Sequence, residues 1–152
     1  MNNIFFMKQA LKEAEKAYLI GEVPIGCIIE LNGKIIGKGY NQRNSKKNVL
    51  CHAEIIAINE ACKNLSDWRL EGSTLYVTVE PCAMCSGAIL QSRIKKVVFG
   101  AYNKKGGCCG SILNILNEEK FNHQSEIISG ILEEDCKNLI KNFFKELRFK
   151  NE

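Results

Sequence analysis

The pair Asn32-Gly33 restricts the fold of this chain more than any other feature, because it stands between two runs rich in β-branched residues, IGCIIEL and KIIGKGY. Asn-Gly is a preferred pair in two-residue hairpin turns, where both positions need a positive φ. The two runs are therefore predicted to be antiparallel neighbours. A sheet that contains this hairpin must include at least one antiparallel pair of strands.

Beyond the hairpin, segments with helical spacing alternate with short apolar runs. Helices are predicted over residues of about 3–20, 52–65, 81–90 and 131–148, and further strands over 73–80, 95–100 and 125–130. Strands joined by helices are typical of a partly parallel sheet with both faces covered. Together with the hairpin, they predict an α/β fold, a three-layer α/β/α sandwich around a mixed sheet. The last helix is predicted to turn these residues inward: Leu132, Cys136, Leu139, Ile140, Phe143 and Leu147.

The chain of 152 residues has the length of one domain, so residues 1–152 are expected to form a single domain. No apolar run is long enough to span a membrane, and we expect no membrane association. The N-terminus lacks the basic start, apolar stretch and small-residue cleavage site that follow one another in a signal peptide. This favours a cytoplasmic location. In a reducing compartment the eight cysteines are more often packing, metal-binding or catalytic residues than disulfides.

Two short motifs, HAE at 52–54 and PCAMC at 81–85, each stand at the start of a predicted helix. If both helices begin at the same edge of the sheet, the side chains of His52, Cys82 and Cys85 converge. One imidazole and two thiolates suit Zn²⁺, and three protein ligands leave a fourth position for water, as a catalytic site requires. The positive ends of the two helices would favour the thiolate forms.

Glu54 lies two residues after His52, a spacing that sends it in a different direction on a helix, so it is not expected to be a fourth ligand. It is predicted to be the catalytic proton shuttle: zinc-bound hydroxide attacks an electrophilic carbon, and Glu54 passes the proton to the leaving group. H-x-E followed by P-C-x-x-C is the recognised signature of the zinc deaminases. A purely structural zinc site and a redox cysteine pair remain as alternatives. The first leaves Glu54 only a helix-dipole role, and the second does not need the histidine.

Beyond these motifs, the chain resembles the bacterial tRNA-specific adenosine deaminases from about Phe6 to Arg148. The resemblance rests on EVPIG, HAEIIAI, WRLEGSTLYVTVEPCAMCSGAI, VVFGA, GS at 110–111, NH at 122–123, GIL at 130–132 and FF at 143–144. It implies a cytidine deaminase-like mixed sheet of five strands, one Zn²⁺ per subunit, and a homodimer with an RNA groove across it. The implied reaction is hydrolytic deamination, by attack at C6, of the wobble adenosine to inosine in the anticodon loop of an arginine tRNA.

The resemblance also implies a set of substrate-binding residues. Asn41 would hydrogen-bond the flipped purine, and the backbone near Val23, Pro24 and Ala53 would shape the pocket.

The net charge of +4 is only a weak sign of a polyanionic partner, but the basic residues are clustered. Lys104, Lys105 and Arg148 are predicted to contact the phosphates of a tRNA anticodon stem-loop. Phe144 is either stacked on a nucleotide or part of the core.

Two loops depart from the family pattern. Asn48-Val49 replaces a common Asp-Pro pair, which predicts a less rigid loop. Asn103 replaces a common aspartate, which can accept a hydrogen bond from a ribose 2′-OH. Because a neutral amide accepts less strongly, RNA is expected to remain the substrate with a smaller penalty against deoxyribose.

Other functions remain possible from the sequence alone. The same chemistry on a free purine base, nucleoside or nucleotide needs no basic groove, and a zinc-dependent RNA-binding module needs no Glu54. The remaining cysteines are interpreted as small packing residues, with Cys51 ambiguous because it adjoins His52. His123 is interpreted as a hydrogen-bonded structural residue.

Overall fold

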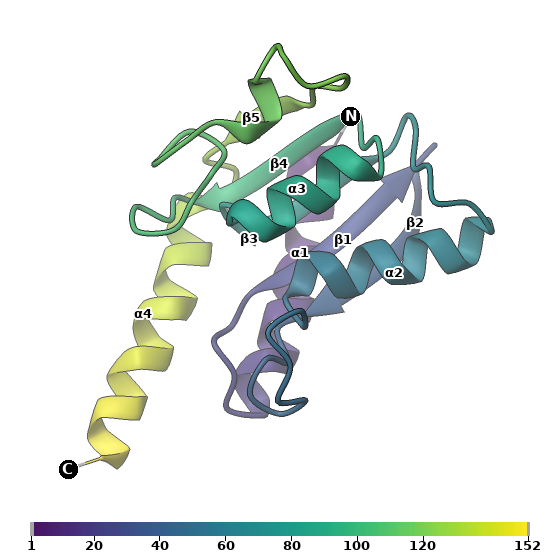
Figure 1. Ribbon diagram of the computed structural model, residues 1–152. Coiled ribbons are helices and arrows are strands. Elements are labelled where there is room, and N and C mark those ends of the chain that lie inside the picture. The colour runs from purple at the N-terminus through teal and green to yellow at the C-terminus, as the bar shows by residue number, and fades with distance from the viewer. Residues whose placement is uncertain (1, 152) are drawn as a thin grey trace.

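The computed structural model describes residues 2–151 (Figure 1). Its elements follow in the order α1 (Asn3–Leu19), β1 (Gly26–Leu31), β2 (Lys34–Tyr40), α2 (Ala53–Leu65), β3 (Thr74–Val79), α3 (Ala83–Gln91), β4 (Lys96–Ala101), the 3₁₀ helix η1 (Ile115–Asn117), β5 (Glu126–Ser129) and α4 (Glu133–Lys150). Every predicted helix and strand is confirmed, and η1 is an addition. Asn32 and Gly33 form the predicted hairpin turn, with φ angles of 52° and 83°.

The five strands form one mixed sheet in the order β2-β1-β3-β4-β5. β1 is antiparallel to both of its neighbours, whereas β3, β4 and β5 are parallel. Two antiparallel pairings in succession make β2 parallel to β3. The carboxyl ends of β2, β3 and β4 therefore lie along one edge of the sheet, and the segments that follow these strands begin there.

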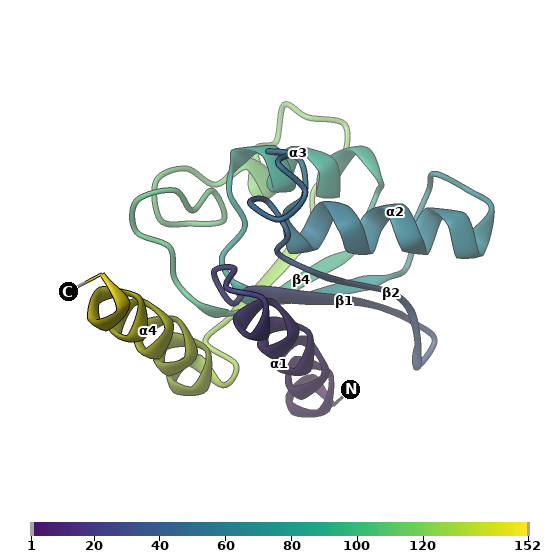
Figure 2. The same cartoon turned by 90° about the horizontal axis from the view of Figure 1, so that it is seen from below.

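Helices cover both faces of the sheet, which confirms the three-layer sandwich. Figure 2 shows α2 and α3 on one face and α1 and α4 on the other. The α2–α3 side packs apolar residues such as Ala57, Ile89 and Phe99 together, and the α1–α4 side packs Met7, Tyr76 and Cys136. Each helix layer thus buries an apolar face against the same central strands.

Glycines on β2 let α2 lie directly on the strand. A Cβ atom at Gly37 would overlap the carbonyl oxygen of Ala57, and one at Gly39 would overlap that of Ala53. Because Ala53 is the first residue of α2, the contact at Gly39 fixes where this helix begins above the sheet.

The buried side chains of α4 extend only as far as Phe143, and every later residue of the helix is exposed. Cys136 and Phe143 are buried, and Leu139 and Ile140 are half-buried. The prediction that Leu147 points inward is wrong, since its side chain is 42% exposed. In Figure 1 the C-terminal half of α4 runs past the edge of the sheet.

The cysteines and His123 behave largely as predicted. All eight cysteines are free; Cys27, Cys108, Cys109 and Cys136 are buried, and Cys62 is only half-buried. His123 bonds through Nε2 to the carbonyl oxygen of Ile94 at 2.9 Å, which confirms a structural role. Within residues 2–151, no helix is both long and apolar enough to cross a lipid bilayer.

Candidate active site

The two sequence motifs meet at the sheet edge where β2 and β3 end. His52 is the N-cap of α2, Cys82 is the N-cap of α3, and Cys85 lies in the first turn of α3. Parallel strands place the starts of both following helices at the same edge, which brings His52 to the two cysteines. The predicted convergence of the three side chains is therefore present.

The ligand atoms of His52, Cys82 and Cys85 all lie within 4.8 Å of one another. His52 Nδ1 is 3.7 Å from Cys82 Sγ and 3.6 Å from Cys85 Sγ. Nitrogen and sulfur ligands at about 2.0–2.3 Å from a tetrahedral Zn²⁺ would stand about 3.6 Å apart. The donor set and its spacing therefore fit such a metal site. Cys51 is not part of this group.

The start of α3 differs from the prediction in one respect. Pro81 is not the first helical residue, because the helix begins at Ala83 with Cys82 as its cap. The carbonyl oxygen of Pro81 instead accepts a hydrogen bond from Cys108 N at 2.8 Å. Pro81 thus connects the cysteine turn to the glycine-rich loop after β4.

Hydrogen bonds within this group favour the charged forms of His52 and Cys82 and the neutral thiol of Cys85. A hydrogen bond from the Cys85 thiol, helped by one to His52, lowers the pKa of Cys82 to about 4 against the opposing effect of burial. The same bond to Cys82, together with burial, raises the pKa of Cys85 far above its ordinary value. The hydrogen bond to Cys82 also raises the pKa of His52. Cys82 is therefore a thiolate at neutral pH, the form that binds metal.

Glu54 lies beside the metal-binding group but outside it. Its side chain is buried, at 4% exposure, and lines the same cavity as His52 and Cys82. Burial raises the pKa of Glu54 to about 7. A carboxyl group with this pKa can hold or release a proton near neutral pH, as general acid–base catalysis requires.

A cavity of about 150 Å³ opens above Glu54. It is smaller than the roughly 300–1,000 Å³ of pockets for drug-sized ligands, so it suits a single small ring system. The residues that line it come from the segment before β1, the last residue of β3 and the segments after β2, β3 and β4: Val23, Ile25, Asn41, Arg43, His52, Ala53, Glu54, Val79, Glu80, Cys82 and Asn103.

The structure places four of the predicted substrate-binding residues in this lining, namely Val23, Asn41, Ala53 and Asn103. Asn41 is buried, donates through Nδ2 to the carbonyl oxygen of Val23 at 3.2 Å, and accepts from Arg43 N at 3.1 Å. It therefore ties the segment before β1 to the loop after β2.

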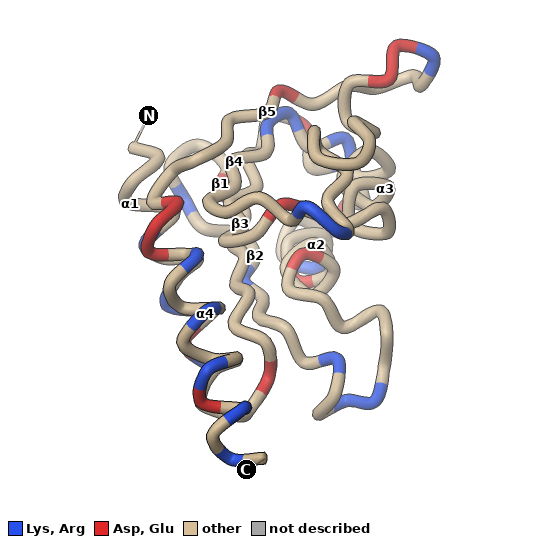
Figure 3. The backbone as a smooth tube through the Cα atoms, turned by 90° about the vertical axis from the view of Figure 1, so that its left-hand side faces the viewer, with Lys and Arg blue, Asp and Glu red and all other residues tan. Residues whose placement is uncertain are grey.

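The other five predicted binding residues lie outside the cavity lining: Pro24, Lys104, Lys105, Phe144 and Arg148. Figure 3 shows basic residues on α4 and in the loops after β2 and β4. Of the basic residues in these segments, Arg43 lines the cavity, whereas Lys104, Lys105 and Arg148 are not in its lining.

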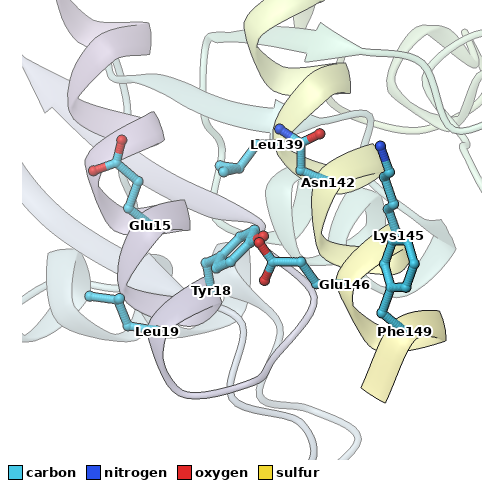
Figure 4. Close-up of a pocket in the computed structure, with 8 residues that line it drawn as sticks. All are labelled: Glu15, Tyr18, Leu19, Leu139, Asn142, Lys145, Glu146 and Phe149. Atoms are coloured by element: carbon cyan, nitrogen blue, oxygen red, sulfur yellow. The ribbon is translucent and has the colours of Figure 1, made fainter. Parts of the chain in front are cut away.

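A larger hollow of about 590 Å³ lies between α1 and α4, away from the metal-ligand group (Figure 4). Tyr18 and Glu146 face each other in it, and Leu19 and Phe149 lie farther toward the helix ends. The titratable residues that line this hollow are Glu15, Tyr18, Lys145 and Glu146. It contains no histidine or cysteine, so the chemistry of the candidate site is confined to the smaller cavity.

Comparison with known proteins identifies the family. The sequence model of the MafB19-like deaminase family matches residues 1–148. The tRNA-specific adenosine deaminase of Bacillus subtilis is 55% identical over 145 residues, which are 95% of this chain and 90% of the relative. The chain belongs to the tRNA-specific adenosine deaminase family. Another tRNA-specific adenosine deaminase, from Rickettsia bellii, is 49% identical over 93% of this chain and 99% of its own.

Solved structures agree with this membership of the tRNA-specific adenosine deaminase family. A structure from a study of A-to-I editing by tRNA:A34 deaminases matches with a TM-score of 0.85 and 38% identity, over 89% of this chain and 98% of that one. The guanine deaminase of Nitrosomonas europaea matches with a TM-score of 0.80 at 19% identity, over 92% and 83% of the two chains. The second likeness shows the shared deaminase fold alone.

Sequence reasoning missed four residues that line the cavity of this tRNA-specific adenosine deaminase family member: Ile25, Arg43, Val79 and Glu80. Ile25 and Val79 read as ordinary strand residues, and Arg43 as part of a polar loop. Glu80 could have been identified from the sequence, because it is a carboxylate directly before the PCAMC motif, at the end of a predicted strand.

Proposed function

We propose that the protein hydrolytically deaminates the wobble adenosine of a tRNA anticodon to inosine, with an arginine tRNA as substrate. The observation that carries this proposal is the group formed by His52, Cys82 and Cys85 with Glu54 buried beside it, at a cavity of the size of one ring system. The high identity to tRNA-specific adenosine deaminases supports the choice of substrate.

His52, Cys82 and Cys85 would hold one Zn²⁺ per subunit. When bound, Zn²⁺ would supply Lewis acidity that lowers the pKa of a water molecule in its open fourth position. Two thiolates neutralise the charge of the cation and weaken this effect, so a protein base next to the site matters more.

Glu54 is that base in this proposal. Its carboxylate would take a proton from the attacking water and then deliver it to the leaving amine at C6 of the purine. A pKa of about 7 lets the same group accept and donate the proton at neutral pH.

The cavity walls would orient the flipped base. Val23, Pro24 and Ala53 would shape the pocket with their backbone, and Asn41 would hydrogen-bond the purine. An anticodon loop offers unstacked bases that can be turned into such a cavity, whereas a base inside a duplex cannot reach it.

The surface outside the cavity would hold the rest of the anticodon stem-loop. Lys104 and Lys105 follow Asn103 in the loop after β4, and Arg148 lies on α4. Phe144 is 41% exposed whereas Phe143 is buried, which supports stacking of Phe144 on a nucleotide over a core role. We further propose that residues 1–152 act as one domain, in a cytoplasmic homodimer whose groove spans both subunits.

The test is incubation of the zinc-loaded protein with an arginine tRNA transcript, followed by sequencing for adenosine read as guanosine. Conversion at the wobble position supports the proposal, and its absence refutes the proposed substrate. Release of ammonia from free guanine, adenosine or cytidine without RNA would instead favour a free-base or nucleoside deaminase. RNA binding that is equal in wild type and Glu54→Ala, with no turnover in either, would favour a non-catalytic module.

A further inference from the structure

The side chain of Glu80 holds the glycine-rich loop after β4. Glu80 is only 2% exposed and stands directly before Pro81 and Cys82. Its Oε1 accepts from Asn103 N at 3.1 Å and from Ser111 Oγ. Its Oε2 accepts from Cys109 N at 3.1 Å and from Ser111 N at 3.0 Å. One carboxylate thus binds both ends of the segment 103–111.

The loop is shaped around this carboxylate. A Cβ atom at Gly107 would overlap the Cδ atom and both carboxylate oxygens of Glu80, so only glycine fits there without movement. All four hydrogen bonds are donated by the loop to the two carboxylate oxygens, so Glu80 acts only as an acceptor here.

We propose that Glu80 is a positioning residue that fixes the Asn103 wall of the cavity against the cysteine turn, and so determines how the substrate is seated. This inference rests on the proposed function, because the substrate is taken to be the anticodon loop. Glu80 would contribute to neither metal binding nor proton transfer. Both Glu80 and Asn103 line the cavity, so movement of this loop changes the shape that the base meets.

Glutamine cannot replace this carboxylate, although its size is the same. An amide offers one accepting oxygen, and its NH₂ group would face donors in either orientation. On the Oε2 side it would face two backbone N–H groups, from Cys109 and Ser111. On the Oε1 side Ser111 Oγ can turn to accept, but Asn103 N would lose its partner.

The experiment compares Glu80→Gln with Glu30→Gln in the zinc-loaded protein. Glu30 is a matched control, because it is also buried and accepts one turn N–H, from Gly33 at 2.7 Å, but at the hairpin away from the cavity. We expect Glu80→Gln to raise the KM for an anticodon stem-loop about tenfold or more, with a smaller change in kcat. Zinc content should be unchanged in both variants, and Glu30→Gln should keep the wild-type KM.

Amide hydrogen exchange supplies a second readout that does not depend on turnover. In Glu80→Gln the amides of Asn103, Cys109 and Ser111 should lose protection while those of β3 and β4 keep it. Unchanged protection, or lost protection with a wild-type KM, would overturn the proposal. If the wild-type protein deaminates no RNA, the proposed function fails, and exchange still reports whether Glu80 holds the loop.

A milder variant covers the case in which Glu80→Gln does not fold. Ser111→Ala removes one hydroxyl donor and leaves the carboxylate and the backbone bonds in place. It should raise the KM roughly threefold and partly expose the same three amides. Wild-type values for both measurements would overturn the proposal.

Discussion

His52 Nδ1 and Cys82 Sγ lie 3.7 Å apart although 30 residues separate them in the chain, and each residue is the N-cap of its helix. Neither side chain makes a capping hydrogen bond at the start of its helix. Asn, Asp and Ser at such positions stabilise a helix by about 0.5–2 kcal/mol over residues that cannot cap. Both helices therefore lack a stabilising N-cap hydrogen bond, because their N-cap side chains belong to the candidate metal site.

His52→Asn should consequently stabilise the protein once metal has been removed. Asn can cap α2 from the extended backbone that His52 adopts, with φ −77° and ψ 153°. With chelator present, we expect its free energy of unfolding to exceed that of wild type by about 1 kcal/mol. Urea titration measures the difference. His52→Ala, which supplies no cap, is the control and should show no gain. A less stable Asn variant would contradict the idea of a forgone cap.

Glu54→Gln should keep zinc and the fold but lose turnover. Loss of a general acid–base usually costs about 10²- to 10⁴-fold in rate. Single-turnover deamination of the anticodon stem-loop measures the loss, and metal analysis gives the zinc content. A variant that retains wild-type kcat would exclude Glu54 as the proton shuttle.

The same substitution predicts a pH-dependent stability in the metal-free protein. Because burial raises the pKa of Glu54 from 4.5 to about 7, the folded state binds more protons than the unfolded state between these values. Wild-type stability should therefore fall, relative to Glu54→Gln, as pH rises through this window. Unfolding curves at several pH values check the sign. Parallel pH profiles for the two proteins would show that the pKa is not raised.

The proposed phosphate contacts predict a dependence on salt. Replacing Lys104 and Lys105 together by alanine should weaken RNA binding and reduce the slope of log affinity against log salt by about 1.4, since each single-strand contact contributes about 0.7. Lys34→Ala, an exposed lysine at the hairpin, is the control and should leave the slope unchanged. A slope equal to wild type in the double variant would place the RNA elsewhere.

Asn103→Asp should increase discrimination against deoxyribose. Asn103 lines the cavity, and its Oδ1 accepts from Gly106 N at 3.1 Å, which fixes the side chain in its loop. A carboxylate there would accept more strongly from a ribose 2′-OH. The ratio of kcat/KM on an RNA and a matched DNA hairpin measures the effect. Equal ratios for the two proteins would contradict this role for Asn103.

The fold was predictable where local chemistry decides it. Asn32-Gly33 specifies the hairpin, and the periodicity of apolar residues specifies the helices. Periodicity also identified the inward face of α4 at Cys136 and Phe143. The same periodicity gave a wrong prediction at Leu147, because the spacing of apolar residues does not show where the sheet beneath the helix ends.

The candidate site was predictable where its residues form a motif. The spacing of His52, Glu54, Cys82 and Cys85 matches a known catalytic motif. Their chemistry can therefore be inferred before the order of the strands is known. Arg43 and Glu80 have no such spacing. Their place in the cavity depends on β2, β3 and β4 ending at one edge, which only the pairing of the strands reveals.

The hairpin turn at Asn32-Gly33 offers a place to attach a reporter. The seven residues of β2 separate it from Asn41, a span of about 23 Å at roughly 3.3 Å per residue. Both turn residues are exposed, and a Cβ atom added at Gly33 would meet nothing within 4 Å. Both turn residues should stay because each has a positive φ, so Lys34→Cys, at the exposed position directly after the turn, is the better anchor for a fluorophore. A dye at this end of the sheet would report the tumbling of the protein–RNA complex without touching the cavity.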